Sequence, residues 1–264
     1  MGDFLVRAIS LVHTVHNLLE TYGIDGQKFV TSARNTPRFL RTLQDYRRKS
    51  QGVGAFRVDA RRVKPILHEF SDQAGAASGH YFYQDLWAAR KIYAARPTRH
   101  LDIGSRIDGF VSHLLTFMPV TVIDIRPLTS TVEGLTFMQA DATDLAGIQD
   151  DSVESLSSLH AVEHFGLGRY GDPVEPDACF RAMRALVRVL QPGGKLYFSV
   201  PVGIERVEFN AHRVFAPETI LRTMDDLRLL SFAAIDDLDQ FWPNARPAIL
   251  VHAEFACGLF EFTK

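Results

Sequence analysis

The residues best placed to do chemistry begin in the stretch HLDIGSRIDGFVSHLLTFMPVTVID, residues 100–124. A short apolar run there carries Asp102 and ends in Gly104. Gly109 follows, and a second apolar run ends in Asp124, twenty positions after the first glycine. Glycine lets the backbone turn sharply and approach a ligand, and in nucleotide-binding βαβ units an acid at this distance binds the ribose. The stretch therefore predicts such a unit, although two glycines also fit a simple strand-to-helix turn.

Three further groups of polar residues follow apolar runs. Asp141 stands in QADATDL, a polar loop reads SLHAVEHFGLGRYGDP, and EFNAHRVF comes after a later run. In an open parallel sheet, ligands lie at the carboxyl ends of the strands, so we expect these groups to gather around one ligand. The two later groups supply His160, Glu163, His164, Arg169, Tyr170, Asp172, Asn210, His212 and Arg213.

The elements that must position these residues alternate along the chain. Helical patterns near 108–117, 175–190 and 217–226 separate short apolar runs, whereas residues 241–255 fit neither element clearly. This alternation predicts an α/β fold, a Rossmann-like and mostly parallel seven-stranded sheet with helices on both faces. The expected strands are 100–104, 120–125, 135–140, 153–159, 195–200, 227–235 and 258–262.

The N-terminal part reads differently. Apolar residues at helical spacing over 3–21 precede a basic stretch over 34–49. We expect residues 1–56 to form a helical appendage with a solvated basic side, and residues 57–264 to form the α/β domain. The alternative is that these two stretches form a dock for a membrane surface or for a lipid-linked anionic substrate. The apolar helix is also a candidate homodimer contact.

Composition narrows the class of protein. Of 264 residues, 46% are apolar and 23% charged, which is ordinary for a globular protein. A net charge of −2 gives no reason to expect nucleic-acid binding. The two cysteines form no metal or redox spacing, so we expect no metal and a cytoplasmic protein. We expect neither a transmembrane segment nor a signal peptide.

The order DIGS, VIDI, ADATDL, SLHAVEH and LQPGGKLYFSVP resembles the class I S-adenosylmethionine-dependent methyltransferase superfamily over about residues 98–264. A closer resemblance, carried by GHYFYQDLWAARKI, HLDIGSRIDGF, HAVEHFGLGRYGDP and FNAHRVF, extends upstream to about Arg57. It is to a largely uncharacterised bacterial family associated with surface-polysaccharide biosynthesis. The resemblance implies S-adenosylmethionine as cofactor and a polar acceptor such as a saccharide or glycan precursor.

The resemblance also implies roles for residues whose motifs match. Arg106 departs from the pattern, because it stands where the superfamily usually has another glycine, and its bulk could narrow the cofactor cleft. The implied contacts are Asp102, Gly104, Ser105 and Gly109 at the methionine end, Asp124 at the ribose, Ile125, Asp141 and Ala142 around the adenine, and Ser158 to His160 beside the sulfonium.

Transfer to an acceptor hydroxyl needs a base that titrates near neutrality, which is the range of imidazole. His160, His164 and His212 are the candidates. We favour His164, with Glu163 either orienting it or holding acceptor hydroxyls. The residues expected to bind a polar or anionic saccharide are Arg169, Tyr170, Asn210 and Arg213.

Four other interpretations compete with this one. Glu163, His164 and Arg169 could simply tie their loop together through hydrogen bonds. HAVEH also has the H-x-x-E-H spacing of one zinc-peptidase class, but it follows a strand and glycines interrupt any helix after it. A dehydrogenase is disfavoured, because G-x-G-x-x-G is absent and Asp102 would repel a pyrophosphate while attracting an amino-acid ammonium. The last alternative is a non-catalytic scaffold in polysaccharide assembly that kept the fold and lost the cofactor.

Overall fold

The computed structural model describes residues 19, 21–52, 56–72, 74–75 and 77–264. The chain forms two compact units, Met1–Ala76 and Ala77–Lys264, whereas we had expected the division after residue 56. The helix expected over 3–21 lies almost entirely outside the described residues. In the described part of the chain, no helix is long and apolar enough to cross a membrane.

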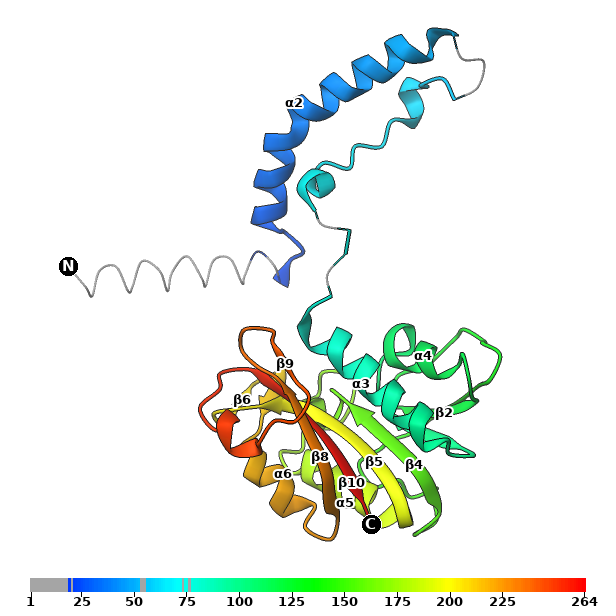
Figure 1. Cartoon of the computed structure of the whole chain (residues 1–264), viewed down its shortest axis with the longest axis vertical. Coiled ribbons are helices and arrows are strands. Elements are labelled where there is room, and N and C mark those ends of the chain that lie inside the picture. Colours follow the sequence, from blue (N-terminus) through cyan, green and yellow to red (C-terminus); the bar gives the residue numbers. More distant parts are fainter. Residues whose placement is uncertain (1–18, 20, 53–55, 73, 76) are drawn as a thin grey trace, which may run out of the picture. The chain divides into compact units, whose positions relative to one another are not determined.

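The first unit is built around one long helix, α2 (Gly26–Lys49), which is shown in blue in Figure 1. The helix begins after Asp25, whose carboxylate accepts a hydrogen bond from the backbone N–H of Lys28 at 2.7 Å. Short 3₁₀ turns follow at Ser50–Gly52, Ala60–Arg62 and His68–Ser71. No residue of α2 is buried, and its basic residues are exposed, in agreement with the solvated basic side we expected.

The second unit is an eight-stranded sheet in the order β3-β2-β1-β4-β5-β10-β8-β9. Neighbours from β3 to β5 pair in parallel, and β10 pairs antiparallel with both β5 and β8. A mostly parallel sheet was predicted, and the eighth strand, β9, comes from the segment whose pattern was ambiguous. The strands are β1 (His100–Ile103), β2 (Val120–Asp124), β3 (Leu135–Gln139), β4 (Val153–Leu159), β5 (Leu190–Val202), β8 (Arg228–Ile235), β9 (Phe241–Trp242) and β10 (Ala256–Thr263).

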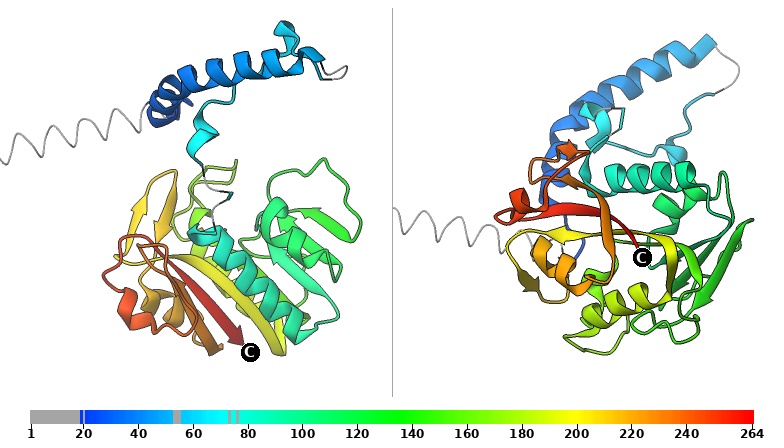
Figure 2. Two further views of the ribbon diagram at one scale, coloured as in Figure 1. Left: turned by 45° about the horizontal axis from the view of Figure 1, so that its top comes forward. Right: turned by 60° about the horizontal axis from the view of Figure 1, so that its bottom comes forward.

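Helices cover both faces of this sheet, as Figures 1 and 2 show. On one face α3 (Gly79–Ala95), the π-turn Ile107–Val111 and α4 (Ser112–Leu114) bury Trp87 and Phe110 against the strands. On the other face α5 (Ala178–Val189) and α6 (Pro217–Thr223) bury Met183 and Ile220. A separate hairpin, β6 (Arg206–Glu208) and β7 (His212–Val214), follows β5.

The strand order creates a crevice beside β1. The chain passes from β1 outward to β2 and β3, and then returns to the other side of β1 as β4. Such a reversal is where ligands bind in open α/β sheets, because the loops leaving the two adjacent strands diverge. Gly104 follows β1 and His160 follows β4, so the fold places both residues at this crevice.

Candidate active site

A cavity of about 260 Å³ opens at the carboxyl ends of β1 to β4. Its wall includes Tyr81 from α3 and Tyr170 from the loop after β4, neither of which we had expected at the cofactor. Six of the residues expected to contact the cofactor line it, namely Gly104, Asp124, Ile125, Asp141, Ala142 and His160.

The other expected cofactor residues lie behind the wall of this cavity. Asp102 is fully buried, and its carboxylate accepts hydrogen bonds from the backbone N–H (3.0 Å) and hydroxyl (2.7 Å) of Ser105 and from the Ser157 hydroxyl (2.5 Å). Burial raises the pKa of Asp102 to about 6. The Ser158 hydroxyl donates to the carbonyl of Ile103 at 3.1 Å. These hydrogen bonds hold the loop after β1 in place. Asp102, Ser105 and Ser158 do not line the cavity.

The segment after Gly104 is shaped by close packing against α3. A Cβ at Gly109 would lie 2.6 Å from Oδ2 of Asp85, so a larger residue here would have to displace the Asp85 carboxylate. Arg106 lines the cavity but does not fill it. Its guanidinium donates to Asp108 at 3.1 and 2.9 Å and lies 5.3 Å from the ring centroid of Tyr81, with 56% of the side chain exposed.

Asp124 lines the cavity and is paired with Arg126. Oδ1 accepts hydrogen bonds from the backbone N–H (2.8 Å) and Nε (3.0 Å) of Arg126, and Oδ2 accepts one from Nη2 at 2.5 Å. The Arg126 guanidinium also lies 4.5 Å from the ring centroid of Tyr170. A carboxylate offers about four acceptor sites, so three are used and one remains on Oδ2. The acid expected at the ribose is therefore present but largely engaged.

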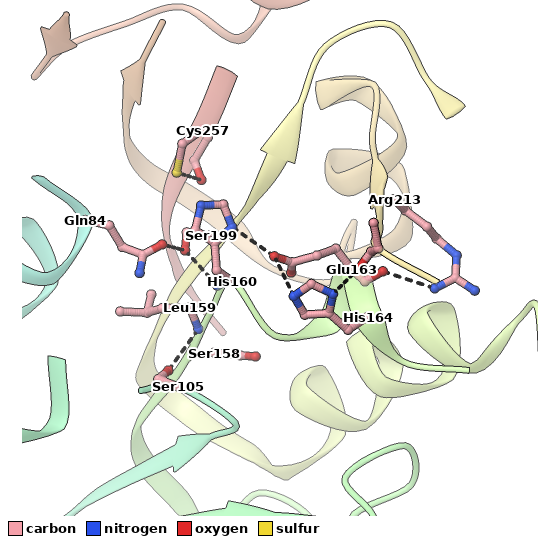
Figure 3. Close-up of polar contacts among 12 residues, drawn as sticks. Gln84, Ser105, Ser158, Leu159, His160, Glu163, His164, Ser199, Arg213 and Cys257 are labelled. Atoms are coloured by element: carbon pink, nitrogen blue, oxygen red, sulfur yellow. Dashed lines mark hydrogen bonds and ion pairs between the residues drawn. The ribbon is translucent and has the colours of Figure 1, made fainter. Parts of the chain in front are cut away.

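The loop after β4 holds His160 in an unusual backbone conformation with φ of 49°. Non-glycine residues in this region cost about 1–3 kcal/mol and persist where the surroundings impose them. Here the backbone N–H of His160 donates to the carbonyl of Ser199 at 3.0 Å, and its Nδ1 donates to Oε1 of Glu163 at 2.9 Å (Figure 3). Burial disfavours the imidazolium, but the neighbouring Cys257 sulfur and the Glu163 carboxylate outweigh it and raise the pKa of His160 well above its ordinary value.

His164 and Glu163 form the next layer of this network (Figure 3). Nδ1 of His164 donates to the carbonyl of Ala211 at 2.6 Å, which leaves the lone pair of the neutral ring on Nε2, 3.8 Å from Oε1 of Glu163. The Glu163 side chain is 2% exposed, and its Oε2 has no hydrogen-bond partner among the described residues. The Glu163 carboxylate therefore lies between the imidazoles of His160 and His164.

A second cavity of about 550 Å³ adjoins the first. The two cavities share Tyr81, His160, His164 and Tyr170, so these four residues mark their junction. His80 lines the second cavity as a neutral imidazole. Burial and the nearby His160 lower its pKa to about 4. The carboxylates that line this cavity belong to Glu163, Asp236, Asp237, Asp239 and Glu254.

His212 also lines the second cavity. Its Nε2 is buried and lies 3.3 Å from Oε2 of Glu208, outside hydrogen-bonding geometry, and it has no other partner in the described structure. Burial lowers the pKa of His212. The ring is therefore neutral near pH 7 and keeps one nitrogen free beside the cavity.

The residues expected to bind the acceptor separate into two pairs. Arg169 and Tyr170 line the second cavity, and Arg169 also donates to the carbonyl of Ala211 at 2.9 Å. Arg213 does not line either cavity. It is buried and donates to the carbonyls of Glu163 (3.3 Å), Phe165 (2.6 Å) and Pro176 (3.2 Å), so it clamps the loop after β4. Asn210 lies in the turn between β6 and β7 with φ of 66° and lines neither cavity.

Sequence reasoning missed the residues that α3 and β10 bring to the site. His80 and Tyr81 come from the first turn of α3, and Cys257 comes from β10. The signal available was the stretch GHYFYQDLW, which has a polar and aromatic start unlike the apolar face that follows. Spacing alone could not show that this turn packs on the loop after β4.

One family model matches residues 140–230, a family described as Caenorhabditis protein of unknown function, DUF268. That match covers well under half of the chain, and its description names no polysaccharide system. No curated protein matches.

Solved structures of similar fold share little sequence with this chain. One is a Burkholderia thailandensis 1,6-didemethyltoxoflavin-N1-methyltransferase with bound S-adenosylhomocysteine, at 17% identity and TM-score 0.47, covering 69% of this chain and 78% of that one. Another is the N-methyltransferase NodS from Bradyrhizobium japonicum WM9, at 14% identity and TM-score 0.47, covering 70% and 87%. The cyclase SpnF matches at 15% identity and TM-score 0.48, covering 68% and 81%. Because these TM-scores are below 0.5 and the identities below 20%, we draw no conclusion about this chain from them.

Proposed function

We propose that this chain is an S-adenosylmethionine-dependent methyltransferase whose first cavity binds the cofactor and whose second cavity binds the acceptor. The observation that carries the proposal is the junction of the two cavities at Tyr81, His160, His164 and Tyr170. A group-transfer enzyme needs two adjoining sites, because most of its rate gain comes from holding two reactants in line. The cofactor, when bound, supplies the methyl carbon and its leaving group.

The first cavity suits this cofactor in charge and in shape. Its carboxylates belong to Asp124, Asp141, Asp172 and Glu175. Both arginines in its wall are paired with acids, Arg106 with Asp108 and Arg126 with Asp124. Such a lining attracts a sulfonium and an ammonium and repels a pyrophosphate. Gly104 has φ of 70°, and a Cβ there would lie 3.0 Å from Cβ of Ala161. The backbone can therefore approach the ligand there without a side chain.

We propose an oxygen of a polar acceptor, such as a saccharide, as the methyl acceptor. Carboxylates around the second cavity can accept hydrogen bonds from hydroxyls, and the Tyr81 and Tyr170 side chains line the same cavity. His164 is the base we favour, because it belongs to both cavities. The Ala211 carbonyl fixes its Nδ1–H, so Nε2 can take the hydroxyl proton, and the Glu163 carboxylate stabilises the imidazolium that forms.

Calorimetry with S-adenosylmethionine and S-adenosylhomocysteine tests the proposal. We expect micromolar binding that weakens at least tenfold in Asp141→Asn, since this acid lines the cavity. Asp225→Asn is the matched control, because Asp225 is exposed and lines neither cavity. If no heat of binding is measured at millimolar ligand, the proposed methyltransferase activity is wrong and the chain is a non-catalytic scaffold. The observation that favours this scaffold is the Arg126–Asp124 pair, because it engages the acid expected to bind the ribose.

A further inference from the structure

Three potential metal ligands converge beside the second cavity, two of which line it. The ligand atoms of His80, His160 and Cys257 all lie within 4.8 Å of one another. They come from the first turn of α3, the loop after β4 and strand β10. This set differs from the H-x-x-E-H pattern in the sequence, because it shares only His160 with that pattern and adds His80 and Cys257. We propose that His80, His160 and Cys257 form a Zn²⁺ site.

The three side chains have few competing partners. Within the described part of the chain, the Cys257 thiol makes a 4.0 Å contact with the carbonyl of Gly258, at the outer limit for a sulfur hydrogen bond, and it also neighbours His160. The ring of His80 stacks on His160 and Phe255, and no hydrogen bond to it is found among the described residues. Cys257 is fully buried, yet no disulfide partner accompanies it. A buried thiol beside two imidazoles is chemically suited to a metal.

The surroundings of His160 match the support that metal-bound histidines require. A ligating histidine almost always donates its other ring N–H to a carboxylate or carbonyl, which fixes its orientation. Nδ1 of His160 makes this bond to Glu163 at 2.9 Å (Figure 3), and the remaining nitrogen faces the side of Cys257. Glu163 in turn is held by its backbone carbonyl, which accepts from Arg213. Glu163 thus acts as a positioning residue for the site.

The ligand set is chemically suited to zinc. One thiolate with two imidazoles is a donor set that zinc prefers, and three protein ligands leave a fourth position open. Zinc bonds of about 2.0–2.3 Å place tetrahedral ligand atoms about 3.5 Å apart, so a small rotation of the side chains closes the site. Binding releases the thiol proton of Cys257 to solvent and replaces any proton on the second nitrogen of His160.

The open position faces the cavity in which the acceptor is proposed to bind. His80 and His160 line this cavity, whereas Cys257 is fully buried and does not line it. A water or an acceptor hydroxyl on the ion would have a lowered pKa, which is what a methyl acceptor needs. Asp237 and Asp239 line the same cavity and help to compensate the charge of the ion. The metal site itself does not depend on methyl transfer.

Cobalt titration of the whole, tag-free chain tests the site after metal is stripped with a chelator. We expect one equivalent of Co²⁺ with a thiolate-to-cobalt absorption band, and displacement of the cobalt by Zn²⁺. Cys257→Ser should abolish the band. The matched control is Cys179→Ser, because Cys179 is equally buried and lies outside the cluster. His80→Ala should weaken binding at least 100-fold, and Glu163→Gln about 10- to 100-fold.

Three outcomes overturn the site. These are wild-type protein that binds no stoichiometric metal, a cobalt complex without the sulfur band, and a band that survives in Cys257→Ser. Circular dichroism and thermal unfolding report whether each variant folds. If Cys257→Ser does not fold, His80→Ala decides, because His80 is only partly buried. Titration of metal-free protein with S-adenosylhomocysteine shows separately whether the proposed function fails.

Discussion

Arg126 donates hydrogen bonds to both carboxylate oxygens of Asp124, the residue expected to hold the ribose. The guanidinium also stacks on Tyr170, which belongs to the wall of both cavities. The pair therefore joins the end of β2 to the loop after β4. A ribose that uses both of its hydroxyls on Asp124 must displace at least one bond from Arg126.

Arg126→Ala should tighten S-adenosylhomocysteine binding by about three- to tenfold. Removing the guanidinium frees Oδ2 of Asp124 to accept a hydrogen bond from the ligand, and hydrogen bonds to a charged group contribute about 1.5–3 kcal/mol each. Part of this gain is offset because the contact between Arg126 and Tyr170 is lost. Arg106→Ala is the control, since its guanidinium bonds Asp108 and leaves Asp124 untouched. Calorimetry of the two variants measures the effect, and weaker binding in Arg126→Ala would show that Arg126 itself holds the ligand.

His164→Gln should lower kcat about 10²- to 10⁴-fold, the usual contribution of a general base. Cofactor affinity should stay within twofold, because His164 acts on the acceptor. The measurement is transfer of labelled methyl to an acceptor found by screening neutral, amino and acidic saccharides. His113→Gln provides the control, since His113 is exposed and lines neither cavity. Full activity in His164→Gln would assign the proton to another group, with His212 the next candidate.

Asp102 should make folding stability depend on pH. Burial raises its pKa to about 6 from 3.8 in the unfolded chain, so the folded state binds the proton more tightly. Its contribution is fully present below pH 4 and is lost as the pH rises through 6. Two pKa units correspond to about 3 kcal/mol. Urea unfolding of wild type and Asp102→Asn between pH 4 and 7 should show the variant gaining up to this amount, and a constant difference would contradict the shift.

Gly166→Ala should destabilise the protein by about 3 kcal/mol or more, at the upper end of single-residue effects. Gly166 has φ of 75°, and a Cβ there would overlap the carbonyl oxygen of Glu175 and crowd Ala178. Gly171→Ala separates the two causes, because Gly171 has φ of 85° but open space around it. Strain in the left-handed region alone costs about 1–2 kcal/mol. If urea unfolding shows equal losses of stability in Gly166→Ala and Gly171→Ala, the backbone angle alone accounts for both effects.

The sequence predicted best those site residues that stand directly after a strand. Gly104, Asp124 and His160 could be placed around one ligand because parallel strands present their carboxyl ends at one edge. The same reasoning predicted seven of the eight strands, and β9 escaped it because two residues carry no periodic pattern.

The spacing of residues in the sequence could not predict the direction in which each side chain points. Arg213 and Asn210 stand near the site in sequence, but one turns into the loop and the other lies in a hairpin turn. Arg126 is only two residues from Asp124, yet spacing alone does not show that its guanidinium bonds this carboxylate and lies on the Tyr170 ring. Cys257 meets His80 because β10 inserts between β5 and β8, a pairing that no local pattern encodes.

That insertion has a consequence for how the chain is made. Strand β8 leaves the ribosome before β10, yet its inner neighbour in the finished sheet is β10. Until residues 256–263 emerge, β5 keeps an unpaired edge of the kind that recruits foreign strands. The half of the sheet from β3 to β5 can assemble early, whereas the second cavity closes last. A pause in translation after β8 would therefore leave a nascent protein that can already take the shape of the first cavity but lacks the second.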